Sequence, residues 1–472
     1  MAGTLNFEFR SGARGPRREG DTARLLLVGD FSARAHRGLA EPASLASRPV
    51  RAVDVDSLDA AVARCATRIV GTPADGIAVD LAIESIDDFH PDRLCEMDPT
   101  LAALLALRRR LLDPREFAAA AAELGAVATP PVTQASAAPP ARETDQQAME
   151  RLLGSAPVRP AGERGAFAPG VVDAFLRQIV GAQQLAPELK FQAQYLAAVD
   201  LQASARLRGM LHLPAFQSAE ALWRGVQMLV ARLDLGDELE LYLLDATPEE
   251  LATEGALARR LGQLAVEAGD AGATWLAVVG LKSFGTTDLD LLASIGAAAG
   301  AAGMPFIAGA QASLAGGFDA NGDWQLPDAA TLGAWQALRA AGVAGSIGLV
   351  APRFLLRLPY GKATDPLDGF AFEELAGTVP QSLELLWGEP ALAAGLALAR
   401  GQQPGALDVE DLPALSYVED GERKLQPCTE WLLAERASVQ VWEQGIMTLL
   451  GSRQRNAARL AGWRTIAAAS EA

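Results

Sequence analysis

Hydrophobic residues follow strand spacing and helix spacing in turn along the first 124 residues. Apolar and polar residues alternate over 77–83, and a continuous apolar run occupies 25–29. Alternation with a period of two is typical of a half-buried strand, and a short apolar run is typical of a strand buried on both faces. Helical spacing is found over 57–69, 101–112 and 114–124. Residues 1–124 are therefore predicted to form an α+β domain.

The second block, residues 171–472, begins with helical patterns and then alternates strands with helices. Helices are expected at 171–186, 190–212, 214–232, 248–268, 289–302 and 332–341 and near 383–400. Strands are expected at 239–243, 274–281 and 305–308. This alternation is typical of an α/β layer with parallel pairing, so the predicted fold class is α/β.

Residues 125–170 are predicted to be a linker between these two domains. The segment 125–145 is rich in Pro and Ala and lacks apolar periodicity, which is typical of a flexible or extended tether. A short helix is possible within 145–154. The chain is thus expected to consist of a domain at 1–124, a linker at 125–170 and a domain at 171–472.

Composition and charge exclude several classes of function. Hydrophobic residues make up 50% of the chain and charged residues 21%, which is a globular composition. The formal net charge of −17 would repel nucleic acid and anionic membranes, so no nucleic-acid partner is expected. The longest uncharged run, 291–310, is long enough to span a membrane. It is mostly Ala and Gly, and Gly303 and Pro305 divide it, so no membrane insertion is expected.

The N-terminus and the cysteines favour a cytoplasmic location. The first ten residues lack the apolar core of a signal peptide. The three cysteines are far apart and odd in number, which suits a reducing compartment better than a disulfide framework.

No pattern in the chain indicates catalysis or a bound cofactor. The sequence around Lys362 lacks the upstream glycine and the following hydroxyl of a phosphate-binding loop. The glycines within 296–303 suit tight helix packing better than phosphate binding. The three histidines form no metal-binding pattern, and adjacent Asp87 and Asp88 are more typical of a cap. We therefore expect no enzyme, no cofactor and no metal.

Two ordered series of motifs resemble the two sheath subunits of type VI secretion systems. Residues 5–124 contain LNFEF, LLLVGDFS, VDVDSLDAAVA, IAVDLAIESIDDFHPD and LAALLALRRRLLD, and resemble the small subunit (TssB or VipA). Residues 195–465 contain LHLPAFQSAEALWRG, PFIA, APRFLLRLPYG and LLWGEPA, and resemble the large subunit (TssC or VipB). The resemblance implies a contractile tail sheath-like fold and a natural fusion of subunits that are usually separate chains.

Departures from the family leave two functions open. The family's large subunit normally continues beyond the region matched by 441–463, so a C-terminally shortened large subunit is expected. GLKSFG stands after the 274–281 strand, where the family has an acidic and aromatic motif. The chain is either a structural sheath subunit or a sheath-derived accessory protein. The accessory protein would cap or regulate a sheath and would not polymerise alone.

As a sheath subunit, the protein would act through surfaces and not through catalysis. The resemblance implies packing around an Hcp-type inner tube, contact with baseplate components, and strand exchange with copies of itself or other sheath subunits. Backbone hydrogen bonds to an open sheet edge give affinity for such exchange. The expected donor strand consists of Leu5, Asn6, Phe7, Glu8 and Phe9.

The resemblance also assigns two further groups of residues. A ClpV-type ATPase dismantles family members by gripping an N-terminal helix of the large subunit. Residues 145–154, with Met149, Leu152 and Leu153 at helical spacing, are a candidate for this handle or for a helix packed on its own block. The motif PRFLLRLPYG is expected to be a strand that ends in a turn, with its two arginines in interface or core ion pairs. Its structural residues are Arg353, Arg357, Pro359, Tyr360 and Gly361.

Overall fold

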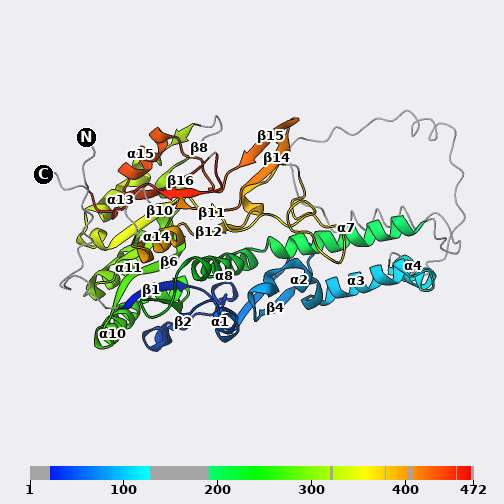
Figure 1. The fold of residues 1–472 in the computed structure, drawn as a ribbon, viewed down its shortest axis with the longest axis horizontal. Helices are drawn as coiled ribbons and strands as arrows, with labels where there is room; N and C mark the ends of the chain where they lie inside the picture. Colours follow the sequence, from blue (N-terminus) through cyan, green and yellow to red (C-terminus); the bar gives the residue numbers. More distant parts are fainter. Residues whose placement is uncertain are drawn as a thin grey trace, which may run out of the picture. The chain divides into compact units, whose positions relative to one another are not determined.

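The computed structural model of the protein describes residues 22–127, 191–318, 323–377, 379–401, 408–452 and 454–468. The chain divides into two compact units, of which the first comprises Met1–Leu101 with Leu207–Ala472 and the second Ala102–Arg206. The first unit mixes helices with a large sheet (Figure 1). The expected α/β class is thus confirmed.

The strands of the described residues differ widely in length. They are β1 (Thr22–Gly29), β2 (Arg51–Val53), β3 (Thr67–Gly71), β4 (Val79–Ile83), β5 (Leu239–Asp245), β6 (Ala273–Phe284), β7 (Phe306–Ala310), β8 (Gly317–Phe318), β9 (Trp324–Gln325), β10 (Ile347–Ala351), β11 (Phe354–Leu355), β12 (Trp387–Gly388), β13 (Asp408–Val409), β14 (Leu415–Glu419), β15 (Glu422–Gln426), β16 (Ile446–Gly451) and β17 (Ala458–Leu460).

The α-helices of the described residues range in length from 4 residues in α9 to 20 residues in α7. They are α1 (Leu58–Cys65), α2 (Pro91–Met97), α3 (Pro99–Leu112), α4 (Phe117–Val127), α7 (Gln192–Leu211), α8 (Pro214–Arg232), α9 (Pro248–Leu251), α10 (Ala256–Asp270), α11 (Leu289–Ala302), α12 (Ala312–Ala315), α13 (Ala329–Ala340), α14 (Ala391–Ala399) and α15 (Glu435–Glu443).

One mixed sheet organises the first unit, with the strand order β13-β17-β16-β10-β7-β6-β1-β5-β2. Strands from β16 through to β5 run parallel, and the outer strands β2, β17 and β13 pair antiparallel with their neighbours. β1 comes from the start of the chain, yet it lies between β5 and β6 from the second block (Figure 1, blue beside green). The two blocks of sequence therefore share one sheet.

Helices cover both faces of this sheet. The side chains of Leu26 and Val28 lie in a core cluster with residues of α10 and α11. Leu25 points to the opposite face, because successive side chains of a strand alternate. There it meets α14, where a methyl group on Gly395 would lie 3.4 Å from Leu25. Burial on both faces is why β1 has the sequence of a continuous apolar run.

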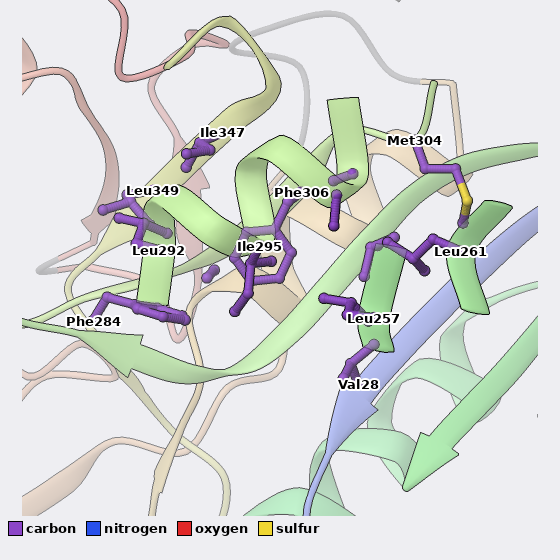
Figure 2. Packing of buried hydrophobic residues seen from close by; sticks show 14 of the residues in the cluster. Val28, Leu257, Leu261, Phe284, Leu292, Ile295, Met304, Phe306, Ile347 and Leu349 are labelled. Carbon is purple, nitrogen blue, oxygen red and sulfur yellow. The ribbon is translucent and has the colours of Figure 1, made fainter. Parts of the chain in front are cut away.

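One extended core cluster lies between the sheet and the helices α10, α11 and α13. Figure 2 shows Val28 of β1 directed toward Leu257 of α10, and Phe306 of β7 lying beside Ile295 of α11. Because Val28 belongs to the first block and Leu257 to the second, the two blocks share hydrophobic core as well as hydrogen bonds.

Several expected elements have different bounds in the structure. The helix expected over 57–69 ends at Cys65, because Ala66 takes a left-handed conformation (φ 49°) and Thr67 begins β3. The helix expected over 248–268 is divided into α9 and α10 at Gly255, which has φ 70°. The helix expected near 383–400 is shorter, since Trp387 and Gly388 form β12 before it.

Other expectations agree closely with the structure. The helix expected over 289–302 is α11 with the same bounds, and Gly303 ends it in the left-handed conformation. Glycines 296 and 300 lie in that helix where close packing requires them, because a methyl group on Gly296 would stand 2.3 Å from Ile347. The helix expected at 171–186 lies outside the described residues.

The second unit contains a small helical core of its own. Buried Leu111, Phe117 and Leu124 pack with Val199 of α7. Arg108 also binds Asp200 through an ion pair, with 2.6 Å between Nε and Oδ1. Within this unit, the last helices of the first block therefore pack on the first described helix of the second block.

Candidate functional site

The two blocks of sequence meet along β1, and a polar contact marks the start of that strand. Arg24 of β1 binds Glu240 of β5, with 2.6 Å between Nε and Oε2. Its guanidinium carbon lies 5.4 Å from the ring centre of Tyr242 and 6.0 Å from that of Trp275. A guanidinium at this distance from aromatic faces gains cation–π attraction in addition to its ion pair. Arg24 thus ties β1 to both of its neighbours in the sheet.

The loop after β1 forms a denser network with the end of β5 and with α9. Ser32 donates two hydrogen bonds to Asp245, from its backbone N (3.1 Å) and its Oγ (2.8 Å). Arg34 donates to Glu250 over 2.7 Å and to Asp245 over 3.1 Å. Arg48 also donates to Glu250. These are charge-assisted hydrogen bonds, the stronger kind, and each crosses from the first block to the second.

Glu250 is the centre of this network and is fully buried. Burial alone would raise its pKa, because it disfavours the charged form. Hydrogen bonds from Arg48, from the backbone of Glu41 and Thr247 and from Arg34 outweigh burial and lower the pKa of Glu250 to about 2. The carboxylate is therefore held in its charged form at the junction of the blocks.

A buried tryptophan completes the junction. Trp223 of α8 donates from Nε1 to the carbonyl of Phe31 and to Oγ1 of Thr67, both at 3.1 Å. The rings of Phe31 and Trp223 lie 5.1 Å apart. The first block thus supplies both a packing partner for the indole ring and acceptors for its N–H. These contacts fix the position of α8 against the loop that follows β1.

The sequence motif at 351–361 contributes a second buried ionic network. Arg357 lies between two buried carboxylates, with 2.8 Å from its Nε to Glu220 Oε1 and 2.7 Å from its Nη1 to Glu374 Oε2. Arg224 pairs with the same Glu220 at 2.7 Å and donates to the hydroxyl of Tyr360 at 2.9 Å. Two guanidinium groups and two carboxylates balance in charge, which is the condition for burying them.

The ionisation of this network follows from burial and pairing. Burial raises the pKa of Glu374, but Arg357, His212 and the backbone N–H of Tyr360 lower it to about 2. Burial raises the pKa of Tyr360 to about 12, with the charge on Glu220 acting in the same direction. The hydroxyl of Tyr360 therefore stays protonated beside the ion pairs.

The other residues of the motif hold the surrounding loops. Arg353 forms a two-pronged ion pair with Glu430, at 2.9 and 2.7 Å. Pro359 is buried. Gly361 leaves room for a neighbouring side chain, since a methyl group there would stand 2.2 Å from Oε2 of Glu373. Within 352–361, regular strand is limited to the two residues of β11, and the rest is an ordered loop.

The partners of these arginines were not identified from sequence. Glu220 shows a local signal, because Arg224 follows it by four residues on one helix face. Glu374, Asp245 and Glu250 have no such signal, since their partners are distant in the chain. The expected donor strand Leu5–Phe9 and the helix at 145–154 with Met149, Leu152 and Leu153 lie outside the described residues.

Neither reactive thiols nor a metal-binding cluster are found in the part of the chain that the structure describes. Cys65, Cys95 and Cys428 are buried, and burial raises the pKa of each thiol, to about 12 for the first two. Within the same ranges, no three His, Cys, Asp or Glu side chains converge to hold a metal ion. No helix in those ranges has both the length and the apolar character needed to cross a membrane.

Two family models match the chain on either side of the expected linker. Residues 22–125 match the model described as type VI secretion system, VipA, VC_A0107 or Hcp2. Residues 193–467 match the model described as VipB, EvpB/VC_A0108, tail sheath N-terminal domain. The first match contains β1 with its loop, and the second contains β5, β6 and the 351–361 motif.

A curated relative supports the second match. The chain is 27% identical over 307 residues to the type VI secretion system sheath protein TssC1 of Pseudomonas aeruginosa strain PAO1. This alignment covers 57% of the chain and 59% of TssC1. Since the VipB model covers more than half of the chain, the protein belongs to the VipB family of tail sheath proteins, with a VipA-like part fused to the VipB-like part.

Proposed function

We propose that the chain is a structural subunit of a type VI contractile sheath, or of a sheath-like assembly, in which one polypeptide supplies both sheath parts. The observation that carries this proposal is the position of β1 between β5 and β6. Because a VipA-like strand lies inside a VipB-like sheet, the two parts of the fused chain would act together as one subunit of the assembly. Fusion fixes the two parts at a one-to-one ratio and raises their effective concentration.

Strand exchange is the proposed means of assembly. β2 and β13 are the outer strands of the described sheet and have three and two residues. An outer strand presents unpaired backbone groups to another chain. We propose that Leu5–Phe9 of one copy pairs with a sheet edge of its neighbour, which is strand addition of the kind seen in many peptide complexes.

Contraction would then be a change between two packings of rigid subunits. The buried networks around Glu250 and Arg357 support a rigid first unit, because breaking either would leave an unpaired buried charge. Copies would surround an Hcp-type inner tube in the cytoplasm and contact baseplate components. A ClpV-type ATPase would recycle them through residues 145–154. None of these steps requires catalysis by the chain itself.

Expression of the full chain alone, and together with an Hcp-type protein, tests the proposal. Negative-stain microscopy and light scattering are expected to show long tubes. A chain that stays monomeric and binds the ends of a sheath made by other subunits would instead be an accessory protein that caps or regulates the sheath. Turnover of a nucleotide or an ester by the purified chain would contradict a purely structural function.

A further inference from the structure

A cavity of about 690 Å³ opens at the carboxyl ends of the parallel strands β1, β6 and β7. Its lining includes the apolar side chains of Leu222, Leu281 and Leu386 and the carboxyl groups of Asp30 and Glu389. In open parallel sheets this end is where ligands bind. A largely apolar pocket with a few converging polar groups is the usual form of a binding site.

Glu389 is a polar residue of the cavity whose carboxyl group packs closely against the backbone of β7. Its Oε2 accepts a hydrogen bond from Ser283 Oγ at 2.7 Å. A methyl group on Gly309 of β7 would stand 2.6 Å from the same Oε2 and 2.2 Å from the same Oγ. Only a glycine at this position lets the strand pass so close to the carboxyl group. Burial raises the pKa of Glu389, although Ser283, Arg353 and Lys282 act in the other direction.

The charges around the cavity are not balanced. Each of its two cations already has a carboxylate, since Lys282 pairs with Asp288 at 3.1 Å and Arg353 pairs with Glu430 at 2.7 Å. Glu389 has no ion-pair partner within 4 Å among the described residues. Glu389 is half-buried. A half-buried carboxyl group without an ion-pair partner in its own chain favours a cationic ligand, because the ligand would supply the opposite charge where water screens it less than at the open surface.

The lining also indicates the shape of the ligand. Three leucines suit a flexible hydrocarbon chain, and Glu389 suits a cation at its end. Leu383, on the rim, has 85% of its surface exposed, and a second protein would cover it. Four of the 41 basic residues of the chain are Lys and the others are Arg, so a cation from a second copy of this chain is far more often Arg than Lys.

We propose that this cavity receives an arginine side chain from a second copy of the chain, with its guanidinium at Glu389. The inference rests on the proposed function, because the second copy is a neighbour in the assembly. The aliphatic part of the arginine packs on Leu222, Leu281 and Leu386. The guanidinium supplies Glu389 with the charge-assisted hydrogen bonds that it lacks within its own chain.

The first test titrates the unassembled full-length protein with n-butylguanidinium, and with n-butylurea as its neutral analogue of the same shape. Calorimetry is expected to show binding of the cation and not of the urea. Glu389→Gln, which keeps an oxygen for Ser283, is expected to weaken binding about tenfold or more. The exposed Glu443→Gln, with the same change of charge, is the matched control and should bind like the wild type. Absence of butylguanidinium binding would overturn the proposal.

The second test measures assembly. Glu389→Gln is expected to raise the protein concentration needed for assembly about tenfold or more while its circular dichroism and melting temperature stay at or above wild-type values. Butylguanidinium is expected to inhibit assembly of the wild type. If wild-type tubes form and Glu389→Gln changes nothing, the arginine contact is wrong and the sheath function stands. If the wild type binds butylguanidinium but never assembles, the second copy and the sheath function both fail.

Discussion

Arg34 donates a hydrogen bond of 2.7 Å to Glu250 and so joins the VipA-like region to the VipB-like region. The two residues stand 216 positions apart in the chain. Glu250 is fully buried and also binds Arg48, so this contact lies where water screens charges least. The two regions therefore share an electrostatic network as well as a sheet and a core.

A chain cut between the two regions should remain one particle. We expect that a protease site inserted after Ala138, once cleaved, yields two fragments that elute together in a one-to-one ratio. The reason is that β1 stays paired with both β5 and β6. Size-exclusion chromatography with light scattering measures this, and uncleaved protein is the control. Separate elution of the fragments under native conditions would contradict a shared sheet.

Removal of Met1–Phe9 should separate folding from assembly. The truncation leaves β1 and its pairs intact, so circular dichroism and the melting temperature should match the full chain. Tubes seen by negative-stain microscopy should disappear, because the proposed donor strand is missing. Tubes of normal length from the truncated chain would refute strand exchange through this segment.

Acid should destabilise the protein through its buried glutamates. The pKa values of Glu250 and Glu374 are lowered from 4.5 to about 2, so the folded state binds fewer protons than the unfolded state between these values. Their contribution to the free energy of unfolding is complete above about pH 4.5 and is lost as the pH falls toward 2. Each contributes about 3 kcal/mol on this basis.

Urea unfolding at pH 7, 5 and 3.5 measures this loss. Glu374→Gln is expected to be less stable than the wild type at pH 7 and to lose less stability between pH 5 and 3.5. The same pH dependence in the variant and the wild type would show that Glu374 titrates normally.

Arg357→Met should be among the most damaging single changes in the first unit. It leaves Glu374 and part of Glu220 as buried charges without their partner, which costs about 3–5 kcal/mol of stability. The double variant that adds Glu374→Gln should recover a large part of the loss, because it removes the carboxylate left without a partner and keeps Glu220 paired with Arg224. Chemical denaturation measures both variants.

An exposed ion pair provides the control for the Arg357 variants. Arg68 and Asp80 pair on the surface, with 54% and 51% of their side chains exposed. Arg68→Met should therefore change the stability by about 1 kcal/mol or less. A double variant no more stable than Arg357→Met would argue that the lost contacts of the arginine, and not the unpaired carboxylate of Glu374, cause the damage.

Two helical glycines should respond in opposite directions to alanine. A methyl group on Gly296 of α11 would stand 2.3 Å from Ile347, so Gly296→Ala should destabilise the fold by about 1–3 kcal/mol. Gly262 of α10 has no heavy atom within 4 Å of the same methyl position. Gly262→Ala should stabilise the fold by about 0.5–1 kcal/mol. Thermal unfolding of both variants against the wild type measures the contrast, and equal effects would refute the packing argument.

Local patterns predicted those elements whose causes are local. β4 follows from alternation, because Val79, Leu81 and Ile83 are buried and the residues between them are exposed. The end of α11 follows from Gly303, which takes the left-handed conformation that stops a helix. The break between α9 and α10 also has a local signal, because Gly255 takes the left-handed conformation. The helical spacing over 248–268 continues past this glycine, and so it predicted a single helix.

Long-range partners could not be predicted in this way. The apolar run at Leu25–Gly29 indicated a strand buried on both faces, but nothing in it names β5 and β6 as neighbours. Arg357 was expected in an ion pair, yet its partner Glu220 lies 137 positions away. Pairing at such distances depends on the whole topology, and a single sequence contains no local trace of it.

The interior position of β1 between β5 and β6 has a consequence during biosynthesis. A ribosome releases this strand first, yet Glu240, which pairs with Arg24, emerges 216 residues later. At roughly 5–20 residues per second, that interval is about 10–40 s, during which an apolar strand has neither of its neighbours. A separately made small subunit meets a finished partner, whereas the nascent fused chain must keep this strand from aggregating until β5 and β6 arrive. We therefore expect the fused chain to need chaperone protection of this strand during translation.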